Sequence, residues 1–447
     1  MQKKHKKQVD LLREAQTANV RLSKSQMSQY VSGRAVPRQN IGIFLAKALQ
    51  VTPAWLYGTD NIEHTYEEGK KTMRQFKKST KLDNVLYDVR GPVVEEANRM
   101  EECGTHVLKL NIGNPAPFGF RTPDEIVYDM KRQLTECEGY SASKGLFSAR
   151  KAIMQYAQLK HIPNVTMSDI YTGNGVSELI NLCMQALLDN GDEILIPAPD
   201  YPLWTATATL AGGNVVHYVC DEQSDWYPDI DDIRSKITDK TKAIVIINPN
   251  NPTGTYVNSA KVEEFIRKLP DHVIPVVDEA YFEYVEDPTH YSLIKMIQEG
   301  YDRPLFVLRT FSKIYGMAGL RIGYTFADPL LIDELMKACQ AWNVSYNALA
   351  AAQAALKDQE YIKKIKALTT AGRKYLEDEL TKLGCTLAKP CANFIYFDTH
   401  HDPKEIRAAL AERKIMISAF GFNRVSVGTE EQNKAFIAAL KEILAAY

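Results

Sequence analysis

The sequence predicts an α/β protein with a large domain on a mostly parallel sheet, then a small α+β domain, and a small all-α unit before both. Its 447 residues are enough for two or three domains. Residues 1–40 carry a net charge of +7 and the rest of the chain −8, which indicates two units with different partners. Apolar runs alternate with helical patterns, as in βαβ units, and these runs are EILI, AIVII, VIPVV and LFVL.

Composition excludes several classes of protein. With 45% hydrophobic and 24% charged residues, the chain is neither disordered nor collagen-like. Its seven cysteines are odd in number and form no C-x-x-C pair, which argues against a disulfide framework or a zinc cluster and favours a reducing compartment. No apolar run approaches the ~18 residues of a membrane-spanning helix, and the Lys-rich start lacks the apolar core of a signal peptide. We therefore expect a cytoplasmic protein with no metal and no membrane partner.

Residues 1–60 are expected to form the helical unit. Helical spacing of apolar residues predicts helices over 9–16, 24–31 and 41–49, the second of them capped by Ser23. Short and amide side chains on the second helix suit the reading of base edges in a major groove, and two arginines after it suit phosphate contacts. The six candidate DNA contacts are Ser23, Lys24, Gln26, Gln29, Arg34 and Arg38.

The run LSKSQMSQYVSGRAVPRQN resembles the XRE/Cro-type helix-turn-helix family, over roughly residues 8–60. That resemblance implies DNA binding. The segment MQKKHKK stands where the family has its first helix, and a small domain that lacks one helix lacks a large share of its core. The alternative is therefore a helical appendage without a role in DNA binding.

The remaining boundaries follow from composition and pattern. Residues 61–80 are polar and predict a linker. Residues 81–120 are expected to form an N-terminal arm with part of the small domain. The alternating pattern places the large domain at 121–330, and more helical periodicity places the small domain at 331–447.

Functional side chains follow five strand-like runs. Open α/β sheets bind ligands at the carboxyl ends of their strands, so these side chains should meet. A Gly-containing turn before a helix suits a phosphate, because free N–H groups and the helix dipole point at it. The other ends carry Tyr201, Asn251, Asp278 and Lys313, the last eight residues before Arg321. A phosphate cradle, a flat ring, an amide, a carboxylate and a lysine are what a pyridoxal phosphate (PLP) site needs.

Three segments together resemble the fold-type-I, class I/II aminotransferases, and the resemblance covers roughly residues 77–447: NPNNPTG, DEAY and TFSKIYGMAGLRIGY. It implies PLP as cofactor and Lys313 as the Schiff-base lysine and proton shuttle. Asp278 would face the pyridine nitrogen, and Tyr201 would stack on the ring. These three are the predicted catalytic side chains. The other implied cofactor contacts are Asn251 and Tyr281 on the ring hydroxyl, and Gly175, Val176, Ser177, Ser312 and Arg321 on the phosphate.

The same resemblance implies substrate contacts and a partner. Arg424, in RVSVGT, matches the arginine that binds the substrate α-carboxylate, with Gly113 and Asn251 beside it. Tyr140, in EGYSASKG, matches a tyrosine lent to the phosphate of the neighbouring subunit. A homodimer that acts on small amino and oxo acids is therefore implied.

The two halves of the chain resemble different subfamilies. Segments up to VIINPNNPTG resemble glutamate–pyruvate (alanine) aminotransferases, and segments from about residue 257 resemble histidinol-phosphate aminotransferases. Histidinol-phosphate aminotransferases usually have a second arginine, and none is present near Ile417-Ser418-Ala419. Tyr201 and Trp204 are expected to form one wall of a small pocket. These features favour alanine/pyruvate with glutamate/2-oxoglutarate. The alternatives are a histidinol-phosphate aminotransferase, a DNA-binding regulator with an aminotransferase-like sensor, and a composite sequence.

Overall fold

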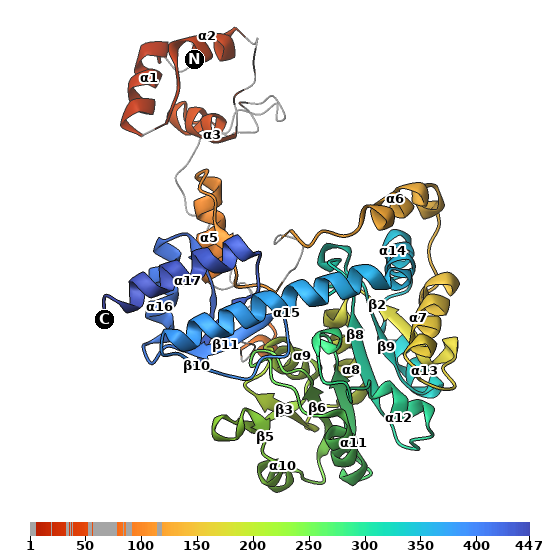
Figure 1. Ribbon diagram of the computed structural model, residues 1–447. Coiled ribbons are helices and arrows are strands. Elements are labelled where there is room, and N and C mark those ends of the chain that lie inside the picture. Colours follow the sequence, from red (N-terminus) through yellow and green to blue (C-terminus); the bar gives the residue numbers. More distant parts are fainter. Residues whose placement is uncertain are drawn as a thin grey trace. The chain divides into compact units, whose positions relative to one another are not determined.

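The computed structural model describes residues 6–18, 20–32, 35, 37, 39–51, 56, 78–83, 85, 92–113 and 119–447. The chain divides into two compact units, Met1–Lys78 and Ser79–Tyr447 (Figure 1).

In the part of the first unit that the structure describes, the helices with defined bounds are α1 (Gln8–Thr17), α2 (Lys24–Val31) and α3 (Gln39–Ala48). Each matches a predicted helix, and α2 has the predicted bounds. The helices pack around a small apolar core that contains Leu11, Met27, Ile41, Leu45, Leu49 and Val51.

The second unit is built on an eight-stranded mixed sheet. The five central strands are parallel, while β9 runs antiparallel to both of its neighbours. Seven strands form the mostly parallel sheet expected from the sequence, and the two-residue β5 extends it at one edge. In spatial order the strands are β2 (Ile170–Gly173), β9 (Gly323–Phe326), β8 (Phe306–Thr310), β7 (Ile274–Asp278), β6 (Thr241–Ile247), β3 (Glu193–Ala198), β4 (Asn214–Asp221) and β5 (Tyr227–Pro228).

Helices cover both faces of this sheet (Figure 1). Neighbouring residues of one strand point to opposite faces, so Val277 joins one core and Val276 the other. Because both cores are apolar, the strands read as continuous hydrophobic runs. One core includes α6 (Asp124–Arg132), α7 (Phe147–Leu159), α11 (Ser259–Lys268), α12 (Ile294–Gln298) and α14 (Tyr346–Lys357). The other includes α8 (Val176–Leu187), α9 (Leu203–Ala211) and α13 (Pro329–Ala338), and α10 (Ile230–Lys236) packs at the β4 edge.

The small domain has an antiparallel sheet in the order β10 (Thr386–Leu387), β11 (Phe394–Asp398), β14 (Phe422–Ser426) and β13 (Ser418–Phe420). Its core is shared with three helices, α15 (Gln359–Lys382), α16 (Pro403–Glu412) and α17 (Glu430–Leu444). A parallel pair joins β1 (Leu108–Lys109) to β12 (Ile415–Met416), so the segment before the large domain adds to the small one. Other helices in the described residues are α5 (Pro92–Glu102) and the 3-10 helices η2 (Thr80–Leu82), η5 (Leu134–Glu138), η6 (Met167–Asp169), η7 (Glu222–Ser224), η8 (Phe282–Tyr284) and η9 (Ala318–Leu320).

The transition between the two domains lies within α15, later than the division at residue 330 drawn from the sequence. Ile332 of α13 and Leu349 of α14 are buried in the cores of the large domain. Ile365 of α15 belongs to the large-domain core, whereas Leu376 belongs to the small-domain core. None of the helices in the described residues combines the length and the apolar character needed to span a bilayer.

Candidate active site

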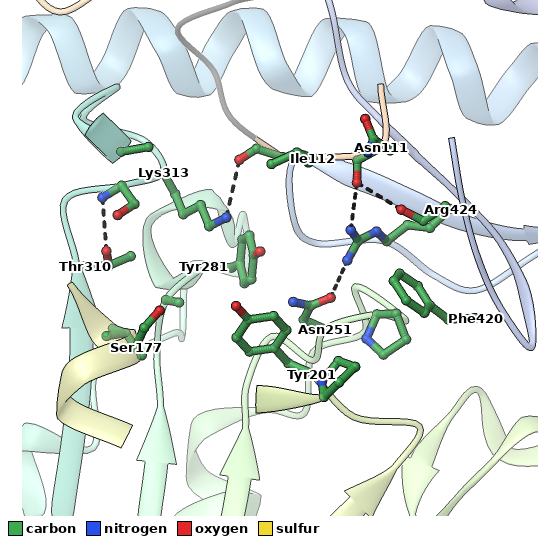
Figure 2. A pocket seen from close by; sticks show the side chains of 18 of the residues that line it. Asn111, Ile112, Ser177, Tyr201, Asn251, Tyr281, Thr310, Lys313, Phe420 and Arg424 are labelled. Atoms are coloured by element: carbon green, nitrogen blue, oxygen red, sulfur yellow. Dashed lines mark hydrogen bonds between the residues drawn. The ribbon is translucent and has the colours of Figure 1, made fainter. Parts of the chain in front are cut away.

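A cavity of about 470 Å³ lies where the carboxyl ends of the large-sheet strands face the small domain. It brings together side chains that are up to about three hundred residues apart in sequence. Figure 2 shows Lys313, Tyr281, Tyr201, Asn251 and Arg424 arranged around this one space. The sequence-predicted residues that line it are Gly113, Val176, Ser177, Tyr201, Asn251, Asp278, Tyr281, Ser312, Lys313, Arg321 and Arg424.

Asp278 ends β7 and is only 4% exposed. Its Oδ1 accepts a hydrogen bond of 2.9 Å from the backbone N–H of Ala280. Burial raises the pKa of this carboxyl from its ordinary 3.8 to about 6, because low polarity penalises the charged form. The N–H of Ala280, the indole of Trp204 and the charge of Lys313 oppose that rise in pKa. A nearby cation therefore favours the ionised form.

Lys313 lies three residues beyond the end of β8 and points into the cavity (Figure 2). Its Nζ donates to the carbonyl oxygen of Gly113 at 3.4 Å and lies 5.2 Å from the centre of the Tyr281 ring. The turn that carries it is fixed by a 3.0 Å hydrogen bond from the Ser312 N–H to Thr310 Oγ1. The turn after β8 thus places the amine, and among the described residues one long hydrogen bond holds it.

The N-terminus of α8 and Arg321 form a cradle with little spare room. Gly175 has φ +75°, and a Cβ there would lie 2.6 Å from Arg321 Nη2. Arg321 donates to the carbonyl oxygens of Asn174 at 3.2 Å and Ala318 at 2.9 Å, so its guanidinium is fixed beside the helix end. Free N–H groups, a helix dipole and a cation together suit a phosphate.

Arg424, on β14, is fixed on the opposite wall. Its two terminal nitrogens donate to Asn251 Oδ1 and to the carbonyl oxygen of Asn111, the latter at 3.1 Å (Figure 2). Its buried Nε has no hydrogen-bond partner among the described residues. The guanidinium lies over the rings of Phe394 and Phe420, and burial lowers its pKa from the ordinary value, although arginine stays charged in proteins. A fixed arginine with an unused donor suits a carboxylate.

One expectation does not hold for this cavity within the chain described. Trp204 does not form a wall of the pocket but is fully buried in the core behind it. Its indole N–H has no hydrogen-bond partner within bonding distance among the described residues, although it lies near enough to Asp278 to lower the pKa of that carboxyl. Tyr140 does not line the cavity of its own chain; it is 82% exposed and stacks on Trp342 at 4.5 Å. That exposure leaves it accessible to a second subunit.

The predicted DNA contacts have mixed surroundings. Ser23 and Gln26 form a capping box: Ser23 Oγ accepts from the Gln26 N–H, and Gln26 Oε1 accepts from the Ser23 N–H. Lys24 and Gln29 are exposed on α2. Arg34 and Arg38 lie outside the described residues. The capping bonds give Ser23 and Gln26 a structural role at the helix end.

A family model for class I and II aminotransferases matches residues 105–440. The chain belongs to this family. It is 54% identical over 254 residues to the glutamate-pyruvate aminotransferase AlaA of Escherichia coli (strain K12). This alignment covers 56% of this chain and 62% of that protein. The chain is 34% identical over 287 residues to a histidinol-phosphate aminotransferase of Moorella thermoacetica. That alignment covers 63% of this chain and 73% of the relative. The chain thus aligns with less than two thirds of the length of the first of these relatives.

The solved structures agree with the fold. The crystal structure of an aminotransferase from Escherichia coli superposes with a TM-score of 0.76 and 39% identity, and the match covers 84% of this chain and 99% of that one.

Sequence patterns missed several residues that line this cavity. Asn111 follows β1, Thr310 ends β8, and Asp200 directly precedes Tyr201, so their neighbours in the motifs could have indicated them. Burial raises the pKa of Asp200, whose carboxylate accepts a 2.7 Å hydrogen bond from Thr205 Oγ1. Arg407 lies in the middle of α16, and no local signal marks it as a cavity residue. Only the packing of α16 brings it to the site.

Proposed function

We propose that this chain is a PLP-dependent aminotransferase that exchanges an amino group between L-glutamate/2-oxoglutarate and alanine/pyruvate. One observation carries the proposal: a single cavity joins Lys313, the buried Asp278 and the fixed Arg424. The 54% identity to a glutamate-pyruvate aminotransferase supports the choice of substrates.

The residues of the cavity fit this cofactor. Asp278 would face the pyridine nitrogen, where a cation favours its ionised form. Asn251 and Tyr281 would hold the ring hydroxyl, and Tyr201 would cover the ring face. When bound, PLP supplies a ring that accepts electrons from the substrate. The phosphate would be held by the N-terminus of α8 with Ser177, by Ser312 and by Arg321, beside the close-fitting Gly175.

Lys313 would then act on the substrate as a general base. Its Nζ, held only by the long contact to the Gly113 carbonyl, is free to take the proton from the α-carbon and to return one. Arg424 would fix the α-carboxylate through its unused donor, so the α-carbon is presented to Lys313. Cavity walls from both domains would limit the access of water.

Histidinol phosphate is the second candidate donor, supported by the Moorella relative. It has a phosphate and no carboxylate, so Arg424 would lose its intended ligand. The resemblance places a second arginine near Ile417-Ser418-Ala419, and Ser418 there is a buried serine whose Oγ donates to the carbonyl oxygen of Asn111 at 2.9 Å. These features favour alanine as the donor.

The test compares alanine and histidinol phosphate with 2-oxoglutarate on one enzyme preparation. We expect a higher kcat/KM for alanine, by about tenfold to a hundredfold, because a charge-assisted contact is worth ~1.5–3 kcal/mol. A higher kcat/KM for histidinol phosphate would overturn the choice of substrate. Failure of both donors, and of any amino acid added singly, to change the absorbance of the bound cofactor would overturn the activity itself.

Three further assignments are part of the proposal. A homodimer with a shared active site is supported by the exposed Tyr140. Weak DNA binding by the first unit is supported by the exposed Lys24 and Gln29 on α2. A cytoplasmic location, expected from the cysteine usage, would be tested by cell fractionation.

A further inference from the structure

Among the residues that the structure describes, four cationic side chains line the cavity, and one of them has no hydrogen-bond or ion-pair partner there. Arg321 and Arg424 each donate two hydrogen bonds, and Lys313 faces Asp278 and the Gly113 carbonyl. Arg407 makes no hydrogen bond or ion pair with any residue in the described part of the chain. A half-buried arginine without a protein partner has all five donors available for a ligand.

The position of Arg407 is set by a well-anchored helix. Its neighbours Ile406 and Leu410 are fully buried in the small-domain core. The first residue of α16 is tied to β14, because Asn423 Nδ2 donates to the carbonyl oxygen of Pro403 at 2.9 Å. A side chain on such a helix can be placed more reproducibly than one on a loop.

Arg407 and Arg424 belong to one continuous wall. Arg424 on β14 is paired in register with Ser418 on β13. Ser418, Ala419 and Phe420 all line the cavity, and α16 packs against β13. The wall therefore runs from Arg424 across β13 to Arg407. Arg407 thus brings a cation to this cavity from α16, an element other than the one that carries Arg424.

The proposed substrates differ in one anionic group. Glutamate and 2-oxoglutarate have a second carboxylate, which alanine and pyruvate lack. A carboxylate that leaves water needs a charge-assisted partner. Asp200 and Asp278 would repel it, and in the proposed function Arg321 binds the phosphate and Arg424 the α-carboxylate.

We propose that Arg407 binds the distal carboxylate of the five-carbon dicarboxylic substrates while Arg424 binds the α-carboxylate. Arg407 is then a specificity residue for one of the two substrate pairs. The inference rests on the proposed function, but it concerns binding and can be tested without turnover.

The test measures binding of glutarate and of pentanoate to the cofactor-loaded full-length protein by calorimetry. The two ligands have the same number of carbons and differ in one carboxylate. We expect Arg407→Gln to weaken glutarate binding by about tenfold to a hundredfold and to change pentanoate binding less than about twofold. Arg407→Lys should recover part of the loss, because it keeps the charge but not the planar fork.

The matched control is Lys404→Gln, which removes one positive charge from the exposed side of the same helix. It should bind both ligands as the wild type does. In steady state, Arg407→Gln should raise KM for 2-oxoglutarate and glutamate by the same factor as the Kd of glutarate, with KM for alanine and pyruvate unchanged.

Three results would overturn the inference: unchanged glutarate binding, an equal loss for both ligands that Arg407→Lys does not recover, or a loss confined to histidinol phosphate. Arg407-dependent glutarate binding in a protein that does not transaminate would uphold the inference and refute the proposed function. Transamination of alanine with 2-oxoglutarate that is insensitive to Arg407→Gln would uphold the proposed function and refute the inference about Arg407.

Discussion

At the scale of single residues, Asp278 shows how a site is prepared for a cation. Its carboxyl ends a buried strand, and burial raises its pKa to about 6. In the protein without cofactor this carboxyl lowers the stability of the fold, because near neutral pH it holds a charge in surroundings of low polarity. We propose that the cation at the pyridine nitrogen removes that cost, so the site is more stable when filled.

This cost predicts a pH dependence for Asp278→Asn in the cofactor-free protein. The folded carboxyl binds its proton more tightly than the unfolded one, so wild-type stability should fall as the pH rises from about 4 to about 6. The Asn variant cannot ionise, and it should be more stable above pH 6 by on the order of 2–3 kcal/mol. Urea unfolding from pH 4 to 8 measures the difference, which should vanish towards pH 4. A difference in unfolding free energy between the two proteins that is independent of pH would contradict the prediction.

Gly175 makes a second prediction at this scale. Gly175→Ala would place a Cβ 2.6 Å from Arg321 Nη2 at a residue with φ +75°. The guanidinium must then move, and we expect the Kd for PLP to rise by about tenfold or more.

Gly191→Ala is the matched control, because Gly191 has φ +98° and a Cβ there meets nothing within 4 Å. It should lose about 1 kcal/mol of stability through backbone strain but keep its affinity for PLP. Equal PLP affinities in the two variants, measured by fluorescence titration, would show that the close approach of Arg321 does not matter.

At the scale of elements, the first three helices form a unit with a core of its own. Helices α1 to α3 pack around Leu11, Met27 and Leu45, and every predicted active-site residue lies beyond residue 110. The two functions proposed for the chain are therefore separable.

Deletion of residues 1–78 should leave transamination within about twofold and abolish retention on DNA at low salt. Within the full chain, Lys24→Ala should reduce the slope of log binding constant against log salt by about one, because one phosphate contact is lost. Arg13→Ala, on α1, is the control and should leave the slope unchanged. DNA retention that survives the deletion would show that the helical unit does not bind DNA.

At the scale of the whole molecule, the active site is expected to need two chains. Tyr140 is exposed, stacks on Trp342 and does not line the cavity of its own chain. We therefore expect Tyr140 to contact the phosphate of a neighbouring subunit.

A hybrid dimer tests this arrangement. One subunit carries Lys313→Ala and the other Tyr140→Ala, and each variant alone should be impaired, the first completely and the second by about tenfold or more. In the hybrid, one site lacks both side chains and the other has both, so about half of the wild-type turnover should return. Turnover of the two-tag-purified hybrid at or below half that of the Tyr140→Ala dimer would show that Tyr140 acts within its own chain.

The sequence by itself determined the sheet and several of the residues that line the cavity at its edge. Continuous apolar runs predict the parallel strands, and the carboxyl ends of parallel strands lie at the same edge of the sheet. Asn251, Asp278 and Lys313 could therefore be assigned to the cavity from their positions after those runs. The predicted helix over 24–31 likewise matches α2, because a cap and its period are local signals.

Only the tertiary structure decided what depends on packing between distant segments. Trp204 was expected in the pocket wall but is buried in the core, since nothing local tells which side of α9 faces the ligand. The domain transition lies within α15, because a single amphipathic helix can supply two cores at once. Arg407 reaches the cavity from α16 because Ile406 and Leu410 turn the helix in that direction. The physical reason is the same in each case: a strand end is fixed by its sheet, whereas the outward face of a helix is fixed only by what it packs against.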